Sequence, residues 1–289
     1  MILTKRDEEL FIKLRDFGLM TTRQVGLMHF PGVALTTVLR RLRKLEDASY
    51  VQRITGLENF EVAWAVTEKV AAVVGEKAFK RHFRRDTLDH DLKLTSLRLA
   101  LEGNGFAWSW IPEHEIRSQL ARRHGLRNLK DRVIPDGLMG IKTGAASESV
   151  AIELELNFKN QKRYQRILSD YSTKRSVWAV WYVVTNRTLG RHLEQLWRKC
   201  RYTSTETKFL WSIFDELIAD PASAAVYGLG AQLRLCDLLV KKSGVAEKEN
   251  AKPLAQTPAQ AVSNLKEIKI LREGDLTPQN LDGKTLLAS

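Results

Sequence analysis

The chain has 289 residues, and its 46 lysines and arginines against 34 aspartates and glutamates give a formal net charge of +12. This excess of positive charge favours a polyanionic partner such as nucleic acid. The longest unbroken apolar run, Val177–Val184, is too short to cross a bilayer, and the N-terminus lacks a signal-peptide pattern, so we expect a cytoplasmic protein without membrane insertion. The spacing of Cys200 and Cys236 excludes a zinc site or a disulfide framework, and we expect both thiols in the core.

Residues 1–75 predict three helices followed by two strands. The helices are expected from Thr4 to about Asp16, from Thr21 or Thr22 to Met28, and from Ala34 to Asp47; the strands are expected over Tyr50–Ile54 and Phe60–Val66. Threonines are frequent helix N-caps, and the alternating apolar residues of the second strand are typical of a half-buried hairpin. This order predicts a winged helix-turn-helix domain.

The third predicted helix has two different sides. One side carries an apolar stripe formed by Leu35, Val38, Leu39, Leu42 and Leu45. The other side carries the residues that we expect to contact DNA, namely Thr36, Thr37, Arg40, Arg41, Arg43 and Lys44. The corresponding helix of a helix-turn-helix enters the major groove, so we expect it to bind duplex DNA. The alternative is that these cations are only solvated.

A second series of elements follows the basic stretch at residues 77–85. They are a helix from Thr87 to Gly103, a strand over Phe106–Ile111, a polar helix or loop over Glu113–His124, strands over Arg132–Ile141 and Ser149–Asn157, a helix over Asn160–Lys174, and a strand over Val177–Thr185. The last strand is continuously apolar, as a central parallel strand is. We therefore predict an α/β fold (α+β overall) in which residues 76–240 form a restriction-endonuclease-like domain of the PD-(D/E)xK type, with the order αβββαβ.

The last part of the chain, residues 241–289, differs in composition. It has no aromatic residue and contains Pro253, Pro258 and Pro278. Such a segment buries too little apolar surface to offset the entropy of ordering, so we predict a largely disordered tail.

Three carboxylates fall on the two predicted middle strands. Asp136 lies on the first, and Glu153 and Glu155 lie on the second. Side chains alternate along a strand, so the two glutamates share a face about 7 Å apart, opposite the apolar residues Val150, Ile152, Leu154 and Leu156. Like charges at this spacing favour a bound divalent cation with oxygen ligands. The alternative is the solvated outer face of an edge strand.

In restriction-endonuclease-like domains, carboxylates hold Mg²⁺ or Mn²⁺, which polarises the scissile phosphate and activates the attacking water. Here the ligands would be Asp136, Glu153 and Glu155. A lysine often stands two positions after the acidic residue, where this chain has Glu155. We therefore consider Lys159 and Lys162 as the residues that supply the missing positive charge.

Several short motifs, in this order, resemble the replication-relaxation family, to which the MOBC-type relaxases of mobilisable and conjugative plasmids are similar. They are Leu3-Thr4-Lys5-Arg6-Asp7, Leu19–Val25, Arg40–Leu45, His90-Asp91-Leu92, Ile134-Pro135-Asp136-Gly137 and Ala151–Glu155. The resemblance implies a metal-dependent nickase that acts on the double-stranded DNA of a plasmid transfer origin, together with other mobilisation or relaxosome proteins. It also implies that His90 is an accessory residue facing the carboxylates, although a histidine there can equally form a helix-end hydrogen bond.

Other DNA-processing classes fit less well. The His-x-His cluster of common relaxases is absent, which excludes that class, and His82 with Arg85 is better explained as a basic connector than as part of a recombinase. Tyr164 and Tyr171 have the spacing of core residues, with a nucleophilic role as the alternative. Two functions stay open: a nickase, and a winged-helix DNA-binding regulator whose nuclease-like domain is catalytically inactive.

Overall fold

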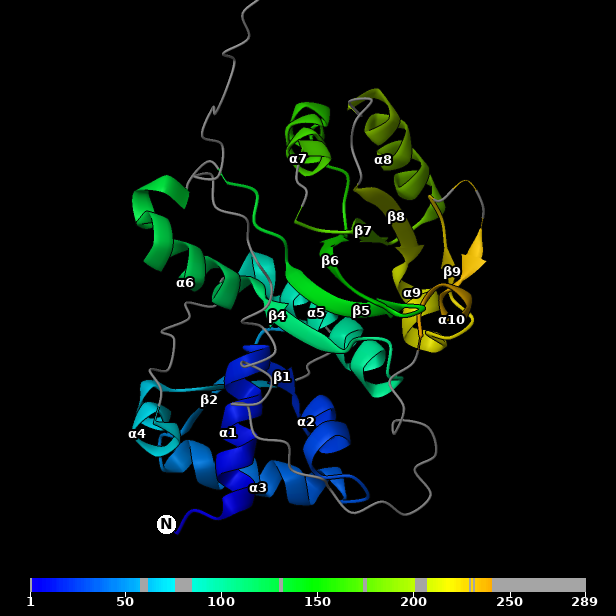
Figure 1. Ribbon diagram of the computed structural model, residues 1–289. Coiled ribbons are helices and arrows are strands. Elements are labelled where there is room, and N and C mark those ends of the chain that lie inside the picture. The colour runs from blue at the N-terminus through cyan, green and yellow to red at the C-terminus, as the bar shows by residue number, and fades with distance from the viewer. Residues whose placement is uncertain are drawn as a thin grey trace, which may run out of the picture. The chain divides into compact units, whose positions relative to one another are not determined.

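The structure is a computed structural model that describes residues 2–57, 62–75, 85–129, 132–173, 176–200, 207–228, 230 and 232–240. All of these belong to one compact unit that covers Met1–Lys248. Residues 58–61, which include the start of the second predicted strand, all of the basic stretch except Arg85, and the tail at residues 241–289 lie outside the described residues. The mixed α/β class is confirmed (Figure 1). None of the helices in the described part of the chain could cross a membrane.

The N-terminal elements follow the predicted order, with one short strand (β1) and two short helical turns (η2 and α4) added. They are α1 (Lys5–Phe17), β1 (Met20–Thr21), α2 (Thr22–His29), α3 (Leu35–Asp47), β2 (Val51–Ile54), β3 (Ala63–Val66), η2 (Glu68–Val70) and α4 (Ala71–Val74). Thr4 caps α1 and Thr21 caps α2: each threonine hydroxyl accepts the N–H of the third helical residue, whose side chain accepts the N–H of the threonine in return. The three strands form an antiparallel sheet in the order β1-β3-β2.

The core under α3 explains why this helix forms. Val38, Leu42 and Leu45 are buried against α1, α2 and the small sheet. The prediction that Leu35 also faces inward is wrong, because its side chain is 44% exposed. Leu35 instead rests on Gly26 of α2, where an added Cβ would lie 3.0 Å from its Cδ2. The other side of α3 faces away from this core.

A five-stranded sheet dominates the second half of the described chain. Its strands, in spatial order, are β4 (Ser109–Pro112), β5 (Gly137–Thr143), β6 (Ala146–Glu155), β7 (Ala179–Val184) and β8 (Lys208–Ile213). β5 pairs antiparallel with both β4 and β6, whereas β7 pairs parallel with both β6 and β8. Every residue of β7 is buried, which confirms the predicted central parallel strand.

Helices cover both faces of this sheet (Figure 1). One face packs against α5 (Arg85–Gly103), α9 (Phe214–Ala219) and α10 (Leu235–Leu238); the other packs against α7 (Gln161–Thr173) and α8 (Arg187–Cys200). The remaining elements are α6 (Glu113–His124), η3 (Leu126–Leu129), β9 (Ala225–Val226) and β10 (Leu233–Arg234). β6 is the middle strand and is covered on both faces, so the alternative of a solvated edge strand is wrong.

Several predicted boundaries shift. The strand expected from Phe106 begins at Ser109, because Phe106 is buried in the turn after α5. The strand expected from Arg132 begins at Gly137, after Pro135, whose nitrogen cannot donate to a ladder. The polar segment that begins at Glu113 is a helix without a buried residue. The elements from α8 onward were not part of the predicted order.

The helix α5 belongs to two cores at once. Leu97 and Leu101 lie in the core beneath the five-stranded sheet, while Leu99 packs against the N-terminal core. Leu88 joins Leu19 and two alanines of β3 in a smaller cluster. The leucines of α5 lie on more than one side of the helix, so they pack against both groups of elements.

Polar contacts strengthen the connection between α5 and the N-terminal elements. The Thr95 hydroxyl donates to the carbonyl of Leu19 at 3.1 Å. Arg98, whose side chain is 8% exposed, donates to the Asp16 carboxylate at 2.6 Å and lies 3.9 Å from the centre of the Phe17 ring. A buried guanidinium is costly unless it is paired, so this contact favours one fixed arrangement of α5 on α1.

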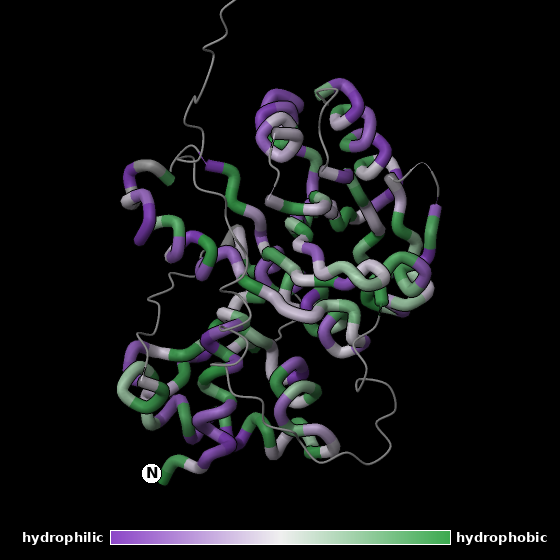
Figure 2. Tube along the Cα trace, viewed as in Figure 1, coloured by the Kyte–Doolittle hydropathy of each residue, from purple (hydrophilic) through white to green (hydrophobic). Residues whose placement is uncertain are grey.

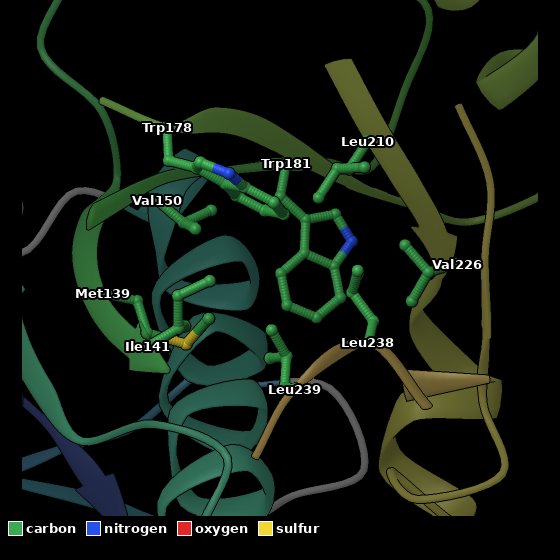
Figure 3. Close-up of a pocket in the computed structure, with 9 residues that line it drawn as sticks. All are labelled: Met139, Ile141, Val150, Trp178, Trp181, Leu210, Val226, Leu238 and Leu239. Atoms are coloured by element: carbon green, nitrogen blue, oxygen red, sulfur yellow. The ribbon is translucent and has the colours of Figure 1, made fainter. Parts of the chain in front are cut away.

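The apolar side of the five-stranded sheet is closed by the last described residues. Figure 3 shows the side chains that meet there: Met139, Ile141, Val150, Trp178, Trp181, Leu210, Val226, Leu238 and Leu239. All are hydrophobic, and the indole nitrogen of Trp181 donates to the Ser212 hydroxyl at 3.1 Å. This region is hydrophobic core and has no polar group that could orient a ligand.

Candidate functional site

The candidate carboxylates meet at one end of the five-stranded sheet. Asp136 directly precedes β5, and Glu153 and Glu155 end β6. β5 and β6 are antiparallel, with Gly137 opposite Ile152, so the start of one strand lies beside the end of the other. The strand register therefore brings together residues that are well separated in the sequence.

Asp136 is held by three elements. Its carboxylate accepts the backbone N–H of Leu154 at 2.8 Å and lies 3.2 Å from His90 Nε2 of α5. Its carbonyl accepts the N–H of Glu113 at the start of α6, at 3.1 Å. The expected orientation of His90 toward the carboxylates is thus observed. Burial acts to lower the pKa of His90, but Asp136 and Asp91 outweigh it and raise this pKa to about 10.

Glu153 lies beneath α7, where the Tyr171 hydroxyl donates to its carboxylate at 2.5 Å. Burial, followed by repulsion from Asp136, raises the pKa of Glu153 to about 8, although the Tyr171 hydrogen bond opposes the rise. Tyr182 stands opposite Glu153 on β7, and its buried hydroxyl has no hydrogen-bond partner among the described residues. Burial and the charge of Glu153 raise the pKa of both tyrosines well above the ordinary value.

Glu155 is 4% exposed and binds Lys159, whose Nζ lies 2.8 Å from Oε2. Burial raises the pKa of Glu155, and Lys159 partly opposes this. Lys162 lies in the first turn of α7 with an exposed side chain. Tyr164 is buried, as predicted for a core residue, and its hydroxyl accepts the Lys159 N–H at 2.9 Å. Of the two candidate lysines, Lys159 is the one in contact with a candidate ligand.

The three candidate carboxylates can be compared with a metal site by their geometry and by their chemistry. Geometrically, the described residues include no group of three or more His, Cys, Asp or Glu side chains that could together hold a metal ion. Each candidate carboxylate has a protein partner instead, namely His90, Tyr171 or Lys159. Chemically, oxygen ligands suit Mg²⁺ and Mn²⁺, and the repulsion between Glu153 and Asp136 is the kind that a cation relieves. The donor types therefore suit a divalent cation, whereas their arrangement among the described residues does not form a metal-binding group.

The candidate DNA-binding residues of α3 separate into two groups. Thr36, Thr37, Arg40, Arg43 and Lys44 are exposed on the helix. Arg41 is half-buried and binds Asp7 of α1 through two hydrogen bonds, one from Nε at 2.8 Å and one from the terminal NH2 group. Burial acts to raise the pKa of Asp7, but the bonds from Arg41 and Thr4 outweigh it and lower this pKa. Arg41 therefore holds α3 on α1.

The replication-relaxation family matches residues 11–179, which is more than half of the chain. The chain belongs to this family. The replication-relaxation match includes α3, His90 and all three candidate carboxylates, and it suggests a role in replication or mobilisation. Comparison with curated proteins and with solved structures found no match.

The replication-relaxation match ends at Ala179, the first residue of β7. Tyr182 lies beyond it, and sequence reasoning did not single out this residue as part of the site. Its position could have been found only from the parallel register that sets it opposite Glu153. The contact between Tyr171 and Glu153 was missed as well, since it depends on how α7 packs on the sheet.

Proposed function

We propose that the protein is a metal-dependent DNA nickase of the relaxase type that acts at a plasmid transfer origin in mobilisation or replication. The observation that carries this proposal is the meeting of Asp136, Glu153 and Glu155 at one end of the sheet, in a basic member of the replication-relaxation family. The protein would act in the cytoplasm on duplex DNA of the origin region, together with other mobilisation proteins.

In this proposal, residues 1–75 form a winged helix-turn-helix that holds the DNA. The order α1-β1-α2-α3-β2-β3 and its antiparallel sheet support this interpretation. Exposed cations on α3, such as Arg40 and Arg43, suit phosphate contacts, and its threonines suit contacts in the groove. We assign docking to these exposed residues and a structural role to Arg41.

Residues 76–240 form a restriction-endonuclease-like domain in the proposal. Support comes from the mixed sheet, the buried parallel strands β6 and β7, and the helices on both faces. The predicted αβββαβ order puts Asp136 on the second strand and the two glutamates on the third; in the structure Asp136 directly precedes β5, and Glu153 and Glu155 end β6.

Asp136, Glu153 and Glu155 are the proposed ligands for Mg²⁺ or Mn²⁺, which when bound polarises the scissile phosphate and activates water as the nucleophile. The protein's own residues position these ligands. His90 fixes the side chain of Asp136, and Tyr171 fixes that of Glu153. Lys159, beside Glu155, would stabilise negative charge that develops on the phosphate.

The deciding experiment incubates the protein with supercoiled plasmid that carries its native origin region, in Mg²⁺ or Mn²⁺ and in EDTA. We expect metal-dependent conversion to open circles that Asp136→Asn or Glu153→Gln reduces by orders of magnitude while DNA affinity is retained, since the α3 surface is separate from these ligands. Glu148→Gln, on the same strand β6, is the matched control and should nick normally. Nicking that survives replacement of all three carboxylates would refute the assignment.

A second candidate is a winged-helix DNA-binding regulator whose nuclease-like domain is catalytically inactive. The pairing of Glu155 with Lys159 favours it, because the lysine already neutralises one of the proposed ligands. This candidate predicts DNA binding without metal-dependent nicking. It also predicts that Mg²⁺ and Mn²⁺ leave the melting curve of the protein unchanged.

A further inference from the structure

The segment Asn157–Arg163, which directly follows the carboxylate-bearing strand β6, is exposed at every position. It contains one aromatic residue, three cations, three amides and no carboxylate: Asn157, Phe158, Lys159, Asn160, Gln161, Lys162 and Arg163. We call it the 157–163 segment. It leads into α7, where Figure 2 shows mostly hydrophilic residues. A positively charged surface with an exposed aromatic ring is the composition of a single-stranded nucleic acid site.

Phe158 is the unusual member of the 157–163 segment. Its side chain is 56% exposed, whereas phenylalanines such as Phe11, Phe106 and Phe209 are buried. The centre of its ring lies 5.8 Å from that of His192 of α8, in a tilted arrangement. With this ring beside it, Phe158 remains more than half exposed in the described part of the chain, so the packing there does not use most of its apolar surface.

The backbone on both sides of Phe158 is fixed. The Tyr164 hydroxyl accepts the N–H of Lys159 at 2.9 Å and donates to the carbonyl of Asn157 at 3.2 Å. Tyr164 itself is fully buried. The Asn160 side chain caps the following helix by accepting the N–H of Lys162 at 2.9 Å. An aromatic ring held outward on a fixed backbone loses little entropy when it binds a ligand.

We infer that Phe158 stacks on an unpaired nucleobase of the DNA strand in the candidate site. Every base has a flat π-face, so such stacking tolerates any sequence, but the bases of an intact duplex are not free to stack on a side chain. Lys159 is paired with Glu155 and is already assigned to the scissile phosphate, which leaves Lys162 and Arg163 as the contacts of this segment with other phosphates of the strand. The inference rests on the proposed function for the identity of the ligand as DNA. It adds that the strand bound at this segment is locally unpaired.

The test uses the full chain in EDTA, so that no nicking is needed, and compares a fluorescein-labelled oligothymidylate with a duplex. Phe158→Ala should weaken binding of the oligothymidylate about 5-fold to 100-fold, which is the range of single-base stacking on an aromatic side chain. Its affinity for the duplex should stay within about twofold, because α3 supplies that contact. Ile218→Ala, which truncates an exposed apolar side chain on α9, is the control and should change neither affinity.

Two more substitutions separate stacking from burial of apolar surface. Phe158→Trp should bind the oligothymidylate as well as the wild type or better, whereas Phe158→Leu, which lacks a π-face, should behave like Phe158→Ala. The inference is overturned if Phe158→Ala binds the oligothymidylate normally, if Phe158→Leu restores binding, or if affinity for the duplex falls equally. A wild type that does not nick but shows this stacking pattern would refute the proposed function and leave the inference standing.

Discussion

The burial of the Glu153 carboxyl group predicts that replacing this residue by glutamine stabilises the metal-free protein. Its pKa rises from 4.5 to about 8, because burial penalises the carboxylate and Asp136 repels it. One pH unit corresponds to about 1.4 kcal/mol, so keeping folded Glu153 protonated at pH 7, where the unfolded chain has released that proton, costs on the order of 3 kcal/mol. Glu153→Gln removes the ionisable group but keeps an oxygen that can accept the Tyr171 hydroxyl. We expect a gain of about 2 to 3 kcal/mol, or about 5 to 10 °C in Tm.

The stability gain from Glu153→Gln should depend on pH. Between pH 4.5 and about 8, the folded protein binds a proton at Glu153 that the unfolded chain has released, so stability falls as pH rises through this window. The difference between Glu153→Gln and the wild type should therefore vanish near pH 4.5 and grow toward pH 8.

The assay is thermal unfolding followed by circular dichroism in EDTA, at several values between pH 5 and pH 8. EDTA removes divalent ions that would offset the charge of the carboxylates. Glu148→Gln makes the same chemical change on the same strand and should leave the pH profile of Tm unchanged. If Glu153→Gln melts at or below the wild-type temperature at pH 8, the carboxylate is not buried beside Asp136 as the structure has it.

Two pairs of substitutions test other parts of the structure. Arg40→Ala should weaken DNA binding and its salt dependence without changing Tm. Arg41→Ala should lower the stability by about 2 kcal/mol, because it leaves the buried Asp7 of α1 without its cationic partner. DNA titrations at two salt concentrations and thermal melts measure both. Gly190→Ala places a Cβ 2.3 Å from a buried tryptophan ring and should cost about 1 to 3 kcal/mol in thermal melts, while Gly103→Ala, with open space around it, should be nearly neutral. Equal Tm values for the two arginine variants, or for the two glycine variants, would contradict these contacts.

Local signals in the sequence were sufficient for the helix starts and the central strand. Thr4 and Thr21 carry the hydroxyls that cap α1 and α2, and these helices begin where the caps predict. The continuous apolar run that begins at Val177 predicted a strand covered on both faces, and β7 is such a strand. These features depend on neighbouring residues, so a single sequence contains the information.

Contacts between distant elements were not predictable in the same way. The alternation of β6 identified Glu153 and Glu155, but the periodicity of a strand does not tell which helix will cover them. The Tyr171 hydroxyl reaches Glu153 only because α7 packs on that face. Arg41 has the same chemistry as Arg40, and only the folded structure pairs it with Asp7. The helix α8 did offer a signal in its buried apolar stripe, which sequence reasoning did not use.

Because α5 packs into both the N-terminal core and the core of the five-stranded sheet, α3 and Asp136 are attached to one shared helix. Arg98 and Thr95 fix that helix against α1 and against Leu19, which directly precedes β1. Under the proposed function, the fixed spacing between α3 and the carboxylates sets the distance from the bound sequence to the nicked bond. Base pairs inserted between them in the origin would leave the nick at the same distance from the bound sequence and move it to a different nucleotide.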